Sequence, residues 1–180
     1  MSKRPIDEEL QDYARLQVRA GLLDEAEALR EVREAIDAEM PGTDSEILAR
    51  AWLAGARKDL LAEQSGWPAE TDHDRLTAVF AELERHRVAV LQGCADHWAA
   101  KALLEQRDDL IGVAWFLAPD VWHAIDEGML EVNLWHSTGA NSAPGDELLD
   151  QVIGVFGRHG LEAHFDEGRI EVSAYWHRRL

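Results

Sequence analysis

The run Gly112-Val113-Ala114-Trp115-Phe116-Leu117 is a short apolar segment in the second half of this 180-residue chain. A short apolar run of this kind is typical of a strand that is buried on both faces of a sheet. A helix is expected from Pro119, and the next strand from Met129 to Trp135. A helix over 145–160 and two closing strands follow. This alternation of strands and helices predicts a mixed α/β architecture for the second half of the chain.

The remaining strands are predicted from alternation and from one turn. Residues 130–136 and 170–175 alternate apolar and polar side chains, which is the period of a strand with one buried face. Residues 88–92 form an apolar strand of the kind found inside a covered sheet. The turn sequence at 166–169 predicts an antiparallel hairpin between the last two strands. Because the other strands are joined through helices, we expect a mixed sheet of about five strands flanked by helices.

The first 65 residues carry helical signals instead. Helices are predicted over 6–21 and 24–39, and a third is expected to begin at a cap at Thr43 or Asp44 and to end near Gln64. Asp24 is expected to cap the second helix, with Glu27 at capping-box spacing. The third helix is expected to bury one apolar stripe, made of Ile47, Leu48, Ala51, Trp52, Ala54, Leu60 and Leu61.

Glycine and proline punctuate residues 65–70, which we interpret as a boundary. The sequence therefore predicts an α+β protein, with a helical segment over 1–65 and an α/β domain over 71–180. Thr71 and the three residues after it are expected to open a further helix that ends near His86.

The charge balance limits the classes of partner. The chain has 35 acidic and 18 basic residues, a net charge of −17, and the acids are dispersed along its length. Nucleic acid and anionic membrane surfaces would be repelled, so we expect neither as a partner. The acidity is interpreted as a source of solubility or, alternatively, as a surface that docks a basic protein. No apolar run approaches the roughly 20 residues of a membrane-spanning helix.

Cysteine usage and the first residues indicate a compartment. The single cysteine, Cys94, fits a reducing environment, and the charged residues 1–9 do not resemble a secretory signal. We therefore expect a cytoplasmic protein. Cys94 is predicted to lie in a loop after the strand at 88–92, where we interpret it as a structural thiol rather than a nucleophile activated by His97.

The eight histidines follow no common metal-binding pattern. No His-x-x-x-His, Cys-x-x-Cys or His-Glu-x-x-His spacing occurs, so neither a metal nor another cofactor is expected. The candidates for a weak metal site are His136 and His177, which each end a predicted strand, with Asp166 or Asp126 as an oxygen ligand.

Tryptophan and histidine are adjacent at three places. Aromatic side chains with a polar group are common where a protein meets a ligand or partner. We therefore expect a partner groove lined by Trp122, His123, Trp135, His136, Trp176 and His177. The basic pair Arg178-Arg179 is predicted to dock on the acidic surface of a second copy, which would make the protein a homodimer or larger homo-oligomer.

From Thr71 onward the chain resembles an uncharacterised bacterial family known only as a domain of unknown function. The residues that carry the resemblance are Thr71-Asp72-His73-Asp74-Arg75-Leu76 with Phe80 and Leu83, the strand Val88–Gln92, Gly112-Val113, Gly128-Met129-Leu130 and Trp176-His177-Arg178-Arg179. The resemblance is looser over the first 60 residues. It departs at His86-Arg87, where a glycine is expected, and at Leu117–Asp120, where a histidine-containing segment is expected. The resemblance implies the fold and no activity.

We therefore expect a non-enzymatic cytoplasmic module for protein interaction or regulation, with an acidic surface. The alternative is a metal-dependent or hydrolase-like enzyme that uses some of His123, His136, His164 and His177 with Asp126 or Asp166. The two hypotheses differ in geometry. An enzyme requires at least three of these groups around one focus, whereas an interaction module does not.

Overall fold

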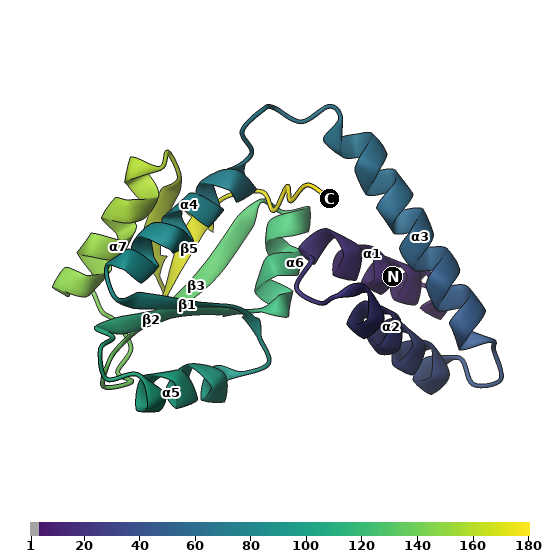
Figure 1. Ribbon diagram of the computed structural model, residues 1–180, viewed down its shortest axis with the longest axis horizontal. Helices are drawn as coiled ribbons and strands as arrows, with labels where there is room; N and C mark the ends of the chain where they lie inside the picture. The colour runs from purple at the N-terminus through teal and green to yellow at the C-terminus, as the bar shows by residue number, and fades with distance from the viewer. Residues whose placement is uncertain (1–3) are drawn as a thin grey trace. The chain divides into compact units, whose positions relative to one another are not determined.

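The computed structural model describes residues 4–180, which form seven helices and one five-stranded sheet (Figure 1). The α+β class is confirmed. The chain divides into two compact units. The helical unit comprises the residues up to Pro68 together with His177–Leu180, and the α/β unit comprises Ala69–Trp176. No helix among residues 4–180 is both long enough and apolar enough to cross a membrane.

The helical unit contains α1 (Ile6–Ala20), α2 (Glu25–Glu39) and α3 (Ser45–Gln64). The capping box predicted for α2 is present, since Asp24 accepts a hydrogen bond from the Glu27 amide at 2.8 Å and Glu27 accepts one from the Asp24 amide at 3.0 Å. Helix α1 ends at Gly21, whose φ of 61° is in the left-handed region. The three helices share a core of Leu10, Ala14, Val32, Ile36 and Ala49.

The stripe predicted for α3 is partly wrong. Leu60 is buried, but Leu61 is 49% exposed and Ile47 is 65% exposed. Successive helical residues are about 100° apart, so Leu61 turns away from the face that Leu60 buries. The apolar residues of α3 therefore extend around much of the helix, and only part of them faces α1 and α2.

The α/β unit holds the sheet. Its elements are α4 (Asp72–Arg85), β1 (Val88–Cys94), α5 (His97–Gln106), β2 (Gly112–Leu117), α6 (Ala118–Asp126), β3 (Met129–His136), α7 (Glu147–Arg158), β4 (Glu162–Asp166) and β5 (Arg169–Ser173). The strand order is β1-β2-β3-β5-β4, with β1 and β2 parallel and the other neighbours antiparallel. The predicted mixed sheet and its closing hairpin are confirmed.

One strand boundary differs from the prediction. Cys94 is the last residue of β1 and pairs with Leu117, whereas the sequence placed it in a loop. The register shifts between Gln92 and Cys94, at Gly93, whose φ is 62°. A glycine bulge of this kind lets the strand continue past a local irregularity that the sequence pattern alone suggests is a strand end.

The two faces of the sheet are covered to different extents (Figure 1). Helices α4 and α7 lie on one face, where Leu130, Val132 and Leu134 of β3 are buried. Helix α5 lies on the other face, where it contacts β1 and β2. On that face the side chains of β3, β5 and β4 are partly or fully exposed. The sheet therefore has one covered face and one face that is covered only at its β1–β2 end.

Candidate functional site

The tryptophan of the last Trp-His pair is part of a core. Trp176 is buried in the α/β unit, where its ring meets His73 edge-on with the centroids 4.7 Å apart and packs edge-on against Phe116 at 6.1 Å. His177, the next residue, belongs to the helical unit and stacks on Trp67 with the ring centroids 4.5 Å apart.

The pair at 135–136 lies at the end of β3. Trp135 packs edge-on against Trp115, with the ring centroids 5.1 Å apart. His136 Nε2 lies 2.8 Å from Asp146 Oδ2, and this hydrogen bond, together with the Ala143 amide, lowers the pKa of Asp146. The interaction joins the end of the strand to the residue that precedes α7.

The pair at 122–123 lies on α6, where both side chains are partly buried. The six predicted groove residues thus come from α6, from the end of β3, and from a terminal segment that is shared between the two units.

The histidines of the enzyme alternative lie beside different carboxylates. His164 on β4 lies 3.2 Å from Glu171, and His136 pairs with Asp146 as described above. Asp166 ends β4, opposite Arg169 across the hairpin. Within residues 4–180, no group of three or more His, Cys, Asp or Glu side chains is arranged to hold a metal ion.

The part of the sheet face that α5 does not cover carries polar side chains. We call it the open sheet face, and it consists of Glu131, Asn133, Glu162, His164, Asp166, Arg169 and Glu171. The strand period places these residues opposite the apolar ones that α4 and α7 cover. Four of the seven side chains are carboxylates, and one is a permanent cation.

Two carboxylates of the open sheet face are direct cross-strand neighbours. Glu131 on β3 is paired in register with Glu171 on β5, and like charges at such positions are destabilising. Arg169 forms an ion pair with Glu131, and His164 lies beside Glu171. A single arginine and a titratable histidine therefore compensate the central acidic pair.

The exposed edge strand adds two further carboxylates. Glu162 and Asp166 lie at the two ends of β4, and both are exposed. Neither makes an ion pair with another residue in the described part of the chain. Their charge is available to a partner without the loss of an existing contact.

Asp120 extends the negative charge towards the start of α6. Its carboxylate accepts a hydrogen bond from the Leu117 amide at 2.7 Å. Burial raises the pKa of Asp120, and the negative charge of Glu131 raises it further, against the opposing effects of the Leu117 hydrogen bond, Arg169 and His123. Burial is thus the main cause of the shift, and Glu131 is the residue of the open sheet face that adds to it.

The net charge is divided unequally between the two units. The α/β unit contains 20 acidic and 7 basic residues, and the helical unit contains 15 and 11. Most of the charge of −17 thus lies in the unit that carries the open sheet face. Sequence alternation predicted which β3 residues share a face. The uncovered state of that face depends on the position of α5, which no local pattern specifies.

No curated protein and no solved structure matches the chain. A family model matches residues 3–180, so the resemblance seen in residues 71–180 extends through the helical unit as well. The chain belongs to the family described as a domain of unknown function (DUF6891).

Proposed function

We propose that this protein is a non-enzymatic, cytoplasmic protein-interaction module whose open sheet face binds a basic partner. The observation that carries the proposal is the direct pairing of Glu131 with Glu171 on an exposed sheet face, beside the unpaired carboxylates Glu162 and Asp166. Folding alone does not favour such an arrangement. Departures from local rules of this kind are expected where a surface serves binding.

The chemistry of the face indicates the class of partner. A lysine- or arginine-rich segment would supply the cations that the face lacks, and the field of the acidic α/β unit would accelerate its approach. Because the contacts are solvent-exposed, the affinity is expected to fall with added salt. The face is too polar to favour a purely apolar ligand.

The basic residues are proposed to belong to another protein. The chain's own terminal arginines already make contacts within the helical unit. Arg178 donates to the carbonyl oxygens of Val18 and Arg19, and Arg179 donates to that of Pro68. Self-association through this pair would have to replace those hydrogen bonds, which makes a separate basic partner the better-supported proposal.

The proposal can be tested with a fluorescently labelled lysine-rich peptide and the full chain. The double variant Glu162→Gln/Asp166→Asn removes two exposed charges from the open sheet face. The control Glu105→Gln/Asp108→Asn removes two exposed charges from the same unit, one on α5 and one just after it. Each lost ion pair is expected to contribute about 0.5–1 kcal/mol, so the first variant, which removes two, should weaken binding roughly 5- to 30-fold.

The control is expected to change the affinity less than about twofold, since it lowers only the long-range attraction. Equal weakening by the two variants would show that the peptide responds to net charge and not to this face, and would contradict the proposal.

A further inference from the structure

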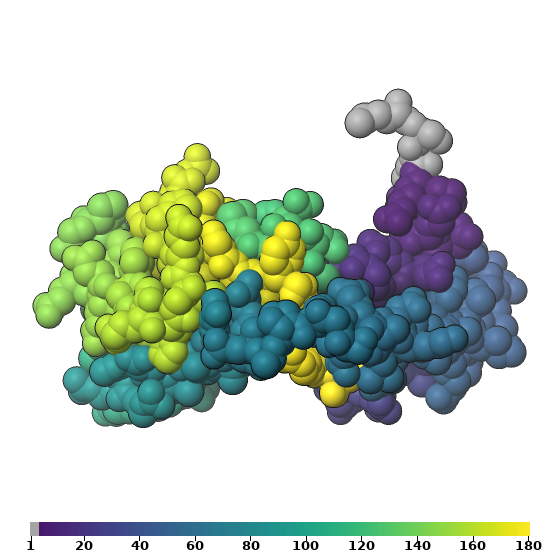
Figure 2. Space-filling view, turned by 90° about the horizontal axis from the view of Figure 1, so that it is seen from above, coloured from purple at the N-terminus to yellow at the C-terminus, as the bar shows by residue number. Residues whose placement is uncertain are grey.

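The helical unit contains a groove of about 690 Å³, a size that accommodates a small molecule. The turn between α1 and α2, one side of α3 and the end of the chain form its walls. The last residues, bright yellow in Figure 2, lie beside the blue end of α3. Aliphatic side chains line much of the groove, among them Val18, Leu23, Leu29, Leu53 and Leu180.

Arg178 brings a guanidinium group to this groove. Its Nη2 donates to the Val18 carbonyl at 3.0 Å and its Nε to the Arg19 carbonyl at 3.4 Å. These carbonyls belong to the last turn of α1, where a cation is favoured. Gly21 is required beside it, because a Cβ at Gly21 would lie 2.1 Å from the Arg178 guanidinium carbon. The guanidinium is thus held in place from one side.

Arg178 has no carboxylate partner within residues 4–180. Burial lowers its pKa, and the positive charge of Arg57 lowers it further. The guanidinium groups of Arg178 and Arg57 therefore both contribute positive charge to this groove. Arg57 has Glu25 at 2.7 Å, so the charge that stays uncompensated is that of Arg178.

The other two cations of the groove, Arg50 and Arg57, each lie beside a carboxylate. Arg50 lies 2.5 Å from Glu46, and Asp24 accepts the Glu27 amide at the start of α2. The groove as a whole combines an aliphatic wall with one guanidinium group, that of Arg178, that has no carboxylate partner. Its complement is a molecule with an apolar body and a single negative charge.

We propose that this groove binds an amphipathic monocarboxylate. The carboxylate would accept hydrogen bonds from Arg178 and Arg57, whose planar donors match two carboxylate oxygens. The aliphatic chain would lie against Leu23, Leu29 and Leu53. The site is distinct from the open sheet face, and either one can fail without affecting the other.

Calorimetric titration of the full chain with dodecanoate, below the concentration at which it forms micelles, tests this proposal. Dodecyltrimethylammonium has the same chain with the opposite charge, and acetate has the same head group without the chain. Dodecanoate is expected to bind with a stoichiometry of one. Acetate and dodecyltrimethylammonium are expected to bind at least tenfold more weakly.

Two substitutions locate the site. Arg57→Gln removes a guanidinium from the groove and is expected to weaken dodecanoate binding about tenfold. Arg33→Gln removes the same charge from an exposed residue of the helical unit that pairs with Glu46 and does not line the groove, so it should change affinity less than about twofold. Arg178→Gln is less suitable as the main test because Arg178 also caps α1.

The proposal would be overturned if dodecanoate did not bind, or if the cationic amphiphile bound equally well. It would also be overturned if Arg57→Gln and Arg33→Gln weakened binding to the same extent. Dodecyl phosphate in a parallel titration identifies the head group, since tighter binding of the dianion would contradict the assignment to a monocarboxylate.

Discussion

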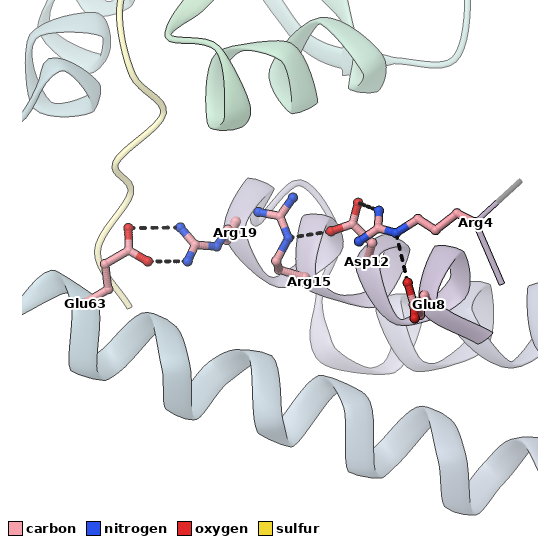
Figure 3. Close-up of polar contacts among 6 residues, drawn as sticks. All are labelled: Arg4, Glu8, Asp12, Arg15, Arg19 and Glu63. Carbon is pink, nitrogen blue, oxygen red and sulfur yellow. Dashed lines mark hydrogen bonds and ion pairs between the residues drawn. The ribbon is translucent and has the colours of Figure 1, made fainter. Parts of the chain in front are cut away.

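The helical unit and the α/β unit differ in how they balance charge. In the helical unit most cations lie beside acids. Figure 3 shows such pairs along α1 from Arg4 to Arg19, whose partner Glu63 lies on α3. In the α/β unit acids outnumber bases by 20 to 7, and carboxylates are neighbours on the open sheet face. The difference concentrates most of the unpaired negative charge in the α/β unit.

The largest expected effect is a loss of folding stability. It should be much greater for a substitution on the covered face of the sheet than for one on the exposed surface of the same unit. Phe116 is completely buried on β2, and Phe116→Ala should lower the free energy of unfolding by about 3–5 kcal/mol because it leaves a cavity. Trp98→Ala removes a side chain that is 58% exposed and should cost less than about 1 kcal/mol. Urea unfolding followed by circular dichroism measures both values. Similar losses for the two variants would contradict the assignment of faces.

A smaller effect is expected along the row of ion pairs in the helical unit. Arg19 forms a two-point ion pair with Glu63, and this hydrogen bonding lowers the pKa of Glu63. The Arg19 side chain is 16% exposed, whereas Arg4, in its pair with Glu8, is 56% exposed. Arg19→Gln should therefore destabilise the protein by about 1 kcal/mol, and Arg4→Gln by less than about 0.5 kcal/mol. A larger loss for Arg4→Gln would refute this ranking.

The α/β unit is expected to contain one strongly pH-dependent contact. Hydrogen bonds from Arg158 and His159 lower the pKa of Glu82 from 4.5 to about 2. Because the folded-state pKa is the lower one, the contribution of Glu82 to stability is fully present above pH 4.5 and is lost as the pH falls towards 2. Thermal melts of wild type and Glu82→Gln should differ most at neutral pH and converge in acid. A difference that is independent of pH would contradict this account.

No change is expected on metal removal. The weak metal candidates His136, His177 and Asp166 were predicted from strand ends alone, and metal analysis of untagged protein with melts before and after chelation tests them. We expect an unchanged melting temperature. Stoichiometric zinc, nickel or iron together with a lower melting temperature after chelation would favour the metalloenzyme alternative over the interaction module.

The local parts of the fold could be predicted from sequence because their signals are local. The cap at Asp24 and Glu27 forms as predicted, and the helix expected to open at Thr71 begins there with a capping box of Thr71 and Asp74. The alternation over 130–136 identified the buried side of β3 correctly. These patterns report hydrogen bonds and side-chain directions that are decided within a few residues.

The candidate sites could not be predicted in the same way. Arg178 contacts Val18 and Gly21, which lie near the other end of the sequence. No pattern near residue 178 indicates that it packs against the end of α1. The juxtaposition of Glu131 and Glu171 depends on the register between β3 and β5. Such contacts follow from the tertiary structure, so the sequence indicated an acidic surface without showing where it is concentrated.

The most direct test of the central claim is a titration of the isotope-labelled full chain with a lysine-rich peptide, followed by amide chemical shifts. The account predicts that the largest shifts occur in β4 and β5, over Glu162–Asp166 and Arg169–Ser173, and in β3 around Glu131. Shifts distributed over all acidic surfaces, or centred on α2 of the helical unit, would contradict it.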